Sequence, residues 1–130
     1  MSKEVINEFQ KLGFIVDHVH ENVYGLTYEL IKLVYRVYPE DKHFIDVGMP
    51  FDISHISRTS AYELANELNV RLKFIKSYVY NDNLWVSCER DISRVQNISA
   101  VVKDIVHCMV NAFHLYVEMK QSESHGFKAN

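Results

Sequence analysis

Apolar residues recur along this chain with two periods, one typical of helices and one typical of strands. Residues 3–12 read as a short helix that ends before Gly13, a residue that commonly follows a helix. Its apolar side is formed by Val5, Phe9 and Leu12. Residues 14–22 are expected to approach the sheet in extended form.

Three strands are predicted next, over residues 23–30, 31–38 and 43–49, because apolar residues alternate with polar ones in each. The links between them are short, and Pro39 favours a turn at residues 39–42 by restricting its own backbone. Adjacent strands with short links form an antiparallel meander.

A second helix is predicted from about Ser60, since Ser60 and Glu63 have the spacing of a capping box. Its apolar stripe consists of Ala61, Leu64, Ala65, Leu68 and Leu72. Asn66 and Asn69 flank this stripe near the helix end. We expect their amides to hold the turn into Phe74 by bonding free helix carbonyls or the backbone of the next strand, with contact to a partner as the alternative.

A hairpin is predicted over residues 74–90, with a two-residue turn at Asp82 and Asn83. That register places Tyr80 opposite Trp85 and Lys76 opposite Glu89, two favourable cross-strand pairs. One side of the hairpin is small and apolar. The other side carries Tyr78, Tyr80 and Trp85, here named the aromatic face.

The last predicted helix covers residues 98–120, and its apolar residues span about half of its circumference. Burying so wide an arc requires the sheet and also another helix or a second subunit. Residues 121–130 are polar and are expected to form a flexible tail.

The predicted order is therefore helix, three strands, helix, two strands, helix, within one domain of residues 1–130. This is an α+β fold in which helices cover mainly one side of a five-stranded antiparallel sheet.

Charge and composition argue against several functions. Lys and Arg total 14 against 17 acidic residues, so the chain lacks the basic excess that attracts nucleic acid. No stretch resembles the ~20 apolar residues of a membrane span, and the N-terminus lacks a signal-peptide pattern. Cys88 and Cys108 are expected to be buried thiols, which fits a reduced, cytoplasmic setting.

Catalytic and metal-binding motifs are not evident in the sequence. No phosphate-binding loop, dinucleotide-binding turn, nucleophile elbow or zinc-protease motif occurs. His18 and His20 would share a face of a strand, with Asp17 or Glu21 nearby, but no third ligand is recognisable. We therefore expect no enzyme activity, no metal and no cofactor.

The aromatic face permits three interpretations. Its rings could stack nucleic-acid bases, a helix of the same chain could cover them, or they could contact a protein, since Tyr and Trp are enriched in protein interfaces. The charge balance argues against the first.

Residues 60–92, "SAYELANELNVRLKFIKSYVYNDNLWVSCERDI", resemble the bacterial YbjN family, whose members are proposed to regulate sensory transduction. The resembling features are Ala65, Asn66 and Asn69 on a helix, then a hairpin, then a long apolar helix. The resemblance implies a fold like that of type III secretion chaperones, which are small, typically dimeric cytoplasmic proteins. It transfers no catalytic residue.

We therefore expect a non-enzymatic protein-binding module, chaperone-like or regulatory, that binds a protein partner or itself as a homodimer. The alternative is a sensor that binds a small ligand in a pocket between sheet and helices.

Overall fold

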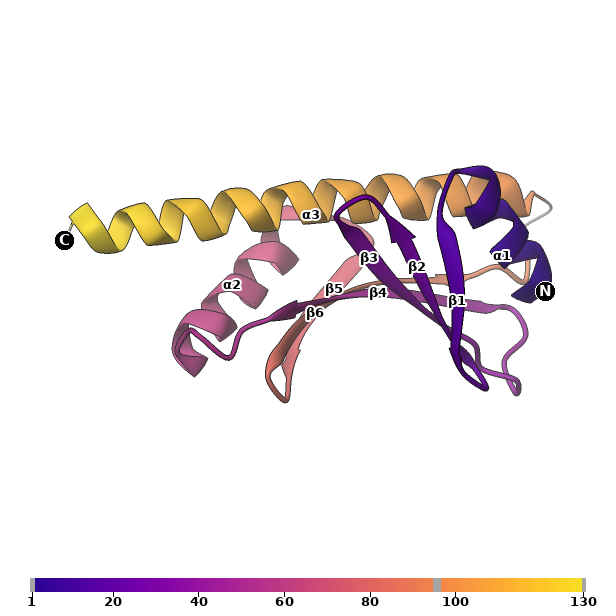
Figure 1. The fold of residues 1–130 in the computed structure, drawn as a ribbon, viewed down its shortest axis with the longest axis horizontal. Helices are drawn as coiled ribbons and strands as arrows, with labels where there is room; N and C mark the ends of the chain where they lie inside the picture. The colour runs from indigo at the N-terminus through magenta and orange to yellow at the C-terminus, as the bar shows by residue number, and fades with distance from the viewer. Residues whose placement is uncertain (1, 95–96, 130) are drawn as a thin grey trace.

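The computed structural model describes residues 2–94 and 97–129, which form one sheet and three helices (Figure 1). The α+β class and the predicted order of helices and strands are confirmed, apart from one additional strand. The elements are α1 (Ser2–Lys11), β1 (Ile15–His20), β2 (Val23–Tyr28), β3 (Ile31–Arg36), β4 (Phe44–Asp52), α2 (Arg58–Arg71), β5 (Ile75–Tyr80), β6 (Asn83–Asp91) and α3 (Ile98–Ala129).

The sheet has six antiparallel strands in the order β1-β2-β3-β4-β6-β5, so the prediction of five strands is wrong. The missed strand is β1, which pairs with β2 and forms one edge. Its residues are largely exposed, including Ile15 at 67% and Val19 at 56%. Because β1 buries no complete face, it lacks the strong alternation by which the other strands were recognised.

All three helices pack on the same side of the sheet, here called the inner side (Figure 1). The longest, α3, crosses the sheet and contacts α1 near its start as well as α2 further along. The core between the layers contains side chains from every helix and from β2 to β6, among them Phe9, Leu26, Tyr35, Val47, Leu68, Val86, Ile105 and Met109. No helix of the described residues lies on the opposite side of the sheet, here called the outer side.

The start of α2 differs from the prediction. Arg58 is its first residue, and Ser57 is the N-cap: the Ser57 side chain accepts a hydrogen bond from the Ser60 backbone N–H at 3.1 Å. The expected capping box at Ser60 and Glu63 is therefore wrong. A serine lies three residues before Ser60, so the same capping geometry forms one turn earlier.

The last helix is longer than predicted. Its backbone stays helical through Ala129, where the sequence pattern suggested an end near Lys120 and a flexible tail over residues 121–130. Asn130 lies outside the described residues. By length and composition, Ile98–Ser122 is also apolar enough to cross a membrane, contrary to the expectation that no stretch would be. Within this segment, Ile105 and Met109 are completely buried in the core.

Tyr35 gives the fold a testable sensitivity to alkaline pH. The ring is 2% exposed, and burial together with neighbouring Tyr24 raises the pKa of Tyr35 from 10.0 to about 12. The protonated form is favoured in the folded state, so its contribution is complete below pH 10 and is lost as pH rises from 10 to 12. Two pKa units correspond to about 2.7 kcal/mol.

We therefore expect the Tyr35→Phe variant to lose less stability than the wild type between pH 10 and 12. Urea unfolding at a series of pH values measures this difference. Parallel stability curves for the two proteins over that range would contradict the assignment.

Candidate protein-binding face

The β5–β6 hairpin turns one residue earlier than predicted. Tyr80 pairs with Asn83, so the turn consists of Asn81 and Asp82 instead of Asp82 and Asn83. Asn81 has a φ of 55°, in the left-handed region that asparagine tolerates well. The expected pairing of Tyr80 with Trp85 is therefore wrong, and Trp85 lies opposite Tyr78.

The aromatic face nevertheless forms as a unit, because the pairing shifts by two residues and strand side chains alternate with a period of two. Tyr78, Tyr80 and Trp85 all lie on the outer side of the sheet. Tyr80 is 64% exposed, while Tyr78 and Trp85 are half-buried. The possibility that a helix of the same chain covers them is wrong, since the helices lie on the inner side (Figure 1).

The Trp85 ring is held from two directions. The Arg36 guanidinium carbon lies 4.4 Å from the centre of the ring, in a cation–π contact. The ring also lies close to Gly48 on β4, where an added Cβ would be 3.2 Å from Trp85 Cε3. A glycine at position 48 therefore leaves the space in which the indole rests against the sheet.

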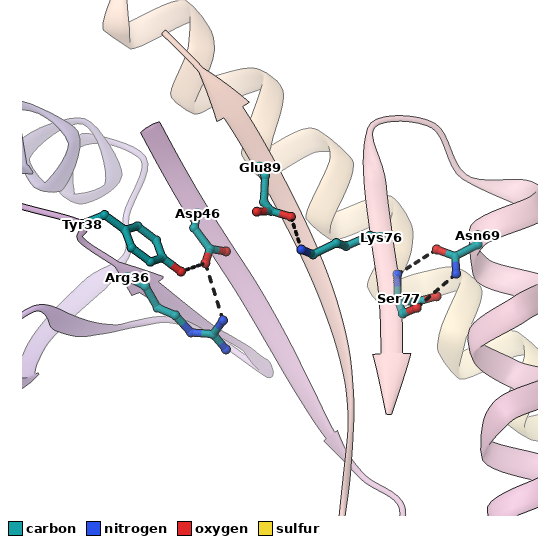
Figure 2. A network of polar contacts seen from close by, with 7 residues as sticks. All are labelled: Arg36, Tyr38, Asp46, Asn69, Lys76, Ser77 and Glu89. Atoms are coloured by element: carbon teal, nitrogen blue, oxygen red, sulfur yellow. Dashed lines mark hydrogen bonds and ion pairs between the residues drawn. The ribbon is translucent and has the colours of Figure 1, made fainter. Parts of the chain in front are cut away.

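Beside this ring, Arg36 and Tyr38 converge on one carboxylate (Figure 2). The Tyr38 hydroxyl donates to Asp46 Oδ2 at 2.7 Å, and Arg36 Nη1 lies 3.5 Å from the same oxygen. Asp46 is 3% exposed, although it faces the side without helices. Burial and the hydrogen bond to Asp46 raise the pKa of Tyr38. Contacts with Tyr78 and Asp46 raise the pKa of Arg36 against the opposing effect of burial.

Two buried oxygens in this region have no hydrogen-bond partner among the described residues: Asp46 Oδ1 and Ser87 Oγ. Ser87 lies opposite Gly48, two residues from Asp46 along β4. Such groups cost stability unless something bonds them. Sequence reasoning missed Arg36, Tyr38 and Asp46. The link between β3 and β4 runs over residues 37–43, and the register that places Arg36 opposite Asp46 was not evident from the sequence.

A second ion pair lies beside the aromatic face. Lys76 Nζ lies 2.6 Å from Glu89 Oε1, and contact with Glu89 raises the pKa of Lys76 (Figure 2). The lysine side chain is 59% exposed, so the pair contributes less than about 1 kcal/mol. The two residues were predicted to lie directly opposite each other; they are diagonal neighbours and still meet. Arg36 and Lys76 are thus each paired with a carboxylate.

Asn69 makes the contact with the next strand that the sequence suggested. Its side-chain amide donates to the Ser77 carbonyl at 3.0 Å, and its amide oxygen accepts from the Ser77 N–H at 2.7 Å (Figure 2). The Ser77 hydroxyl donates in turn to the carbonyl of Ala65. These bonds occupy backbone groups on the outer edge of β5, where another strand would otherwise pair. Asn66 is exposed and borders a surface hollow.

Replacing Asn69 with alanine is expected to lower the free energy of unfolding by about 2 kcal/mol, because two backbone groups of a largely buried residue lose their partners. Asn66→Ala is the matched control, on the exposed side of the same helix, and should change stability by less than about 0.5 kcal/mol. Urea unfolding followed by circular dichroism measures both. Equal stabilities of the two variants would show that the Asn69 contacts contribute nothing.

The structure does not bring His18 and His20 onto one face as predicted. A β-bulge between them shifts the register, so His18 lies opposite Tyr24 and His20 opposite Val23. Consecutive residues of β2 point to opposite sides, and the two imidazoles therefore diverge. The His18 ring stacks on Tyr24 with centres 4.6 Å apart. Among the side chains of residues 2–94 and 97–122, no three His, Cys, Asp or Glu residues are grouped to hold a metal ion.

The hollows described in the structure lie at its surface. One lies between α1 and the start of α3, a second along the exposed surface of α2, and a third beside the loop between β4 and α2. The space between sheet and helices is occupied by the core side chains. None of these three hollows matches the pocket that the small-ligand alternative requires.

Comparisons with known proteins relate this arrangement to solved structures. No protein-family model matches the chain, and no curated protein matches it. The crystal structure of YbjN from E. coli, proposed to be a transcription regulator, is similar with a TM-score of 0.74 and 8% sequence identity, over 95% of this chain and 93% of YbjN. An uncharacterised protein from Methanothermobacter thermautotrophicus has a TM-score of 0.67 and 14% identity, over 95% of this chain and 99% of its own.

At these identities the similarity concerns the fold and not the residues of a site. It covers nearly the whole chain, whose order of helices and strands was predicted from the sequence pattern. That expectation is confirmed: the chain has a YbjN-like fold.

Proposed function

We propose that this protein is a non-enzymatic, cytoplasmic protein-binding module with a chaperone-like or regulatory role. The observation that supports it is the aromatic face, where three large aromatic side chains gather on the side of the sheet that carries no helix of the described residues. Tyrosine and tryptophan bury much area at low conformational cost, which is why they are frequent in interface centres. A partner segment would lie across Tyr78, Tyr80 and Trp85.

The charges around these rings favour a protein over a nucleic acid as the partner. Arg36 is engaged with Asp46, and Lys76 with Glu89. A nucleic-acid surface needs cations that are free to neutralise phosphates. Here each cation already has a carboxylate, so a phosphate backbone would have to compete with it. A largely uncharged protein segment would meet no such barrier.

Self-association is the second part of the proposal. Beyond its buried stripe, α3 has a neighbouring row of partly exposed apolar residues: Val106, Val110, Phe113 and Val117. A second copy that covers this row would bury the remainder of the wide apolar arc. Light scattering at micromolar concentration is expected to give twice the chain mass of 15.3 kDa. A particle of 15.3 kDa would remove the dimer from the proposal.

Photo-crosslinking locates the partner. A photoreactive phenylalanine analogue replaces Tyr80 on the aromatic face or, as a matched control, Tyr62 on α2, which is 57% exposed. Irradiation in cells is expected to join the partner to position 80 and not to position 62. Identical adducts from both positions, or adducts from position 62 alone, would exclude the aromatic face as the binding surface.

A further inference from the structure

On the inner side of the sheet, an arginine lies between the two cysteines of the chain. Arg90 Nη2 on β6 is 3.8 Å from Cys108 Sγ on α3. Cys88 precedes Arg90 by two residues on the same strand, so both side chains point to the same side. Cys88 belongs to the buried core against which Cys108 packs, so both thiols lie where α3 meets the sheet. The three side chains thus form one cluster at the contact between α3 and the sheet.

Arg90 lacks the carboxylate partner that a half-buried cation normally has. No ion pair joins it to an acidic side chain among the described residues. Its Nε is buried without a hydrogen-bond partner, and its guanidinium carbon lies 4.9 Å from the centre of the Phe74 ring. Among the described residues, its charge is engaged by the Phe74 ring and by the two thiols. A guanidinium in this position stabilises a thiolate when one forms.

The two cysteines differ in accessibility. Cys88 is completely buried, whereas Cys108 is partly exposed. Burial raises the pKa of the Cys88 thiol, and the nearby Arg90 opposes this effect only in part. Cys108 is therefore the thiol that a small reagent reaches first. Cys88 is the buried, protonated thiol that can react with Cys108 afterwards.

We propose that Cys108 and Cys88 form a peroxide-reactive dithiol site, in which oxidation joins α3 to β6 by a reversible disulfide. The site is independent of the aromatic face, which lies on the other side of the sheet. Its substrate class is a small hydroperoxide, with hydrogen peroxide as the simplest member. Arg90 is the positioning residue that keeps a positive charge beside the reacting sulfur.

The reaction has two steps. The Cys108 thiolate attacks one peroxide oxygen, the O–O bond breaks, and a sulfenic acid forms while the leaving hydroxide takes up a proton to become water. The Cys88 sulfur then attacks the sulfenic sulfur; an S–S bond forms, the S–O bond breaks, and a second water leaves with the Cys88 proton. Two thiols lose two electrons in total, and one hydrogen peroxide is reduced to two waters.

Treatment of the reduced full chain with hydrogen peroxide tests the proposal. Both thiols are expected to disappear together, the chain mass to fall by two hydrogen atoms, and dithiothreitol to restore both. In the Cys88→Ser variant a sulfenic acid should persist on Cys108, where dimedone traps it. In the Cys108→Ser variant the remaining Cys88 should stay unreacted at the same peroxide dose.

The role of Arg90 is tested by the rate at which the thiols are oxidised, and not by the final amount of disulfide. Arg90→Met should slow the loss of thiols by about tenfold, and Arg90→Lys should retain most of the rate, since a cation remains. Circular dichroism and thermal melting check that each variant is folded. The wild-type result decides even if an Arg90 variant does not fold: two thiols that persist, or separate oxidation of each without a disulfide, would overturn the proposal. The proposal would also be overturned if Cys88 in the Cys108→Ser variant reacted with peroxide as fast as Cys108 does in the Cys88→Ser variant.

Discussion

Replacement of Asp46 with alanine is expected to lower the free energy of unfolding by about 3 kcal/mol. The carboxylate is 3% exposed and accepts the Tyr38 hydroxyl while it faces Arg36. Its removal leaves a half-buried guanidinium without a counterion and a phenol without an acceptor. The loss falls at the lower end of the usual range for broken buried pairs, because Asp46 Oδ1 is already unpartnered.

Urea unfolding followed by far-ultraviolet circular dichroism measures this effect. Asp41→Ala is the matched control, since Asp41 is exposed in the link between β3 and β4. Its replacement should change the free energy of unfolding by less than about 0.5 kcal/mol. The emission of Trp85 should also change in the Asp46 variant, as Arg36 lies over its ring. A stability equal to that of the Asp41 variant would show that the buried carboxylate contributes nothing.

Replacement of Trp85 with alanine is expected to weaken partner binding by about 30-fold or more, the loss typical of a hot-spot tryptophan, equivalent to about 2 kcal/mol. The half-buried ring lies opposite Tyr78 of β5, with Arg36 over it and Gly48 beside it. This support holds the indole in one orientation before a partner arrives, so little entropy is lost on binding.

Titration calorimetry with the crosslinked partner, once purified, measures the affinity. Tyr62→Ala removes an exposed aromatic ring from α2 and should leave the affinity unchanged. Thermal melting of both variants separates lost binding from lost folding. A Trp85 variant that is folded and binds as tightly as the Tyr62 variant would contradict the role of the aromatic face.

The sequence pattern predicted the sides of the strands better than their exact pairing. The hairpin register was wrong by two residues, yet Tyr78, Tyr80 and Trp85 still share a side, because only a shift of one residue exchanges the two sides. The turn moved because Asn81, not Asn83, adopts the left-handed backbone. Local chemistry allowed either asparagine, and the strand pairing of the whole sheet decided between them.

Other features depend on contacts that no local pattern encodes. β1 was missed because it is an exposed edge strand, and its bulge separated His18 from His20. Buried thiols were expected at Cys88 and Cys108, but their common contact with Arg90 arises only when α3 packs on β6. The role of Asn69 was accessible from its position near a helix end, whereas its specific partner, Ser77, required the structure.

The central claim is that a protein partner binds across the aromatic face, and Trp85 makes a direct measurement possible. It is the only tryptophan of the chain, so its indole N–H gives one side-chain resonance in the nuclear magnetic resonance spectrum of nitrogen-15-labelled protein. Titration with the unlabelled crosslinked partner is expected to shift or broaden this resonance in proportion to the fraction bound. An indole resonance that stays unchanged while other resonances of the chain respond would place the partner elsewhere and contradict the account.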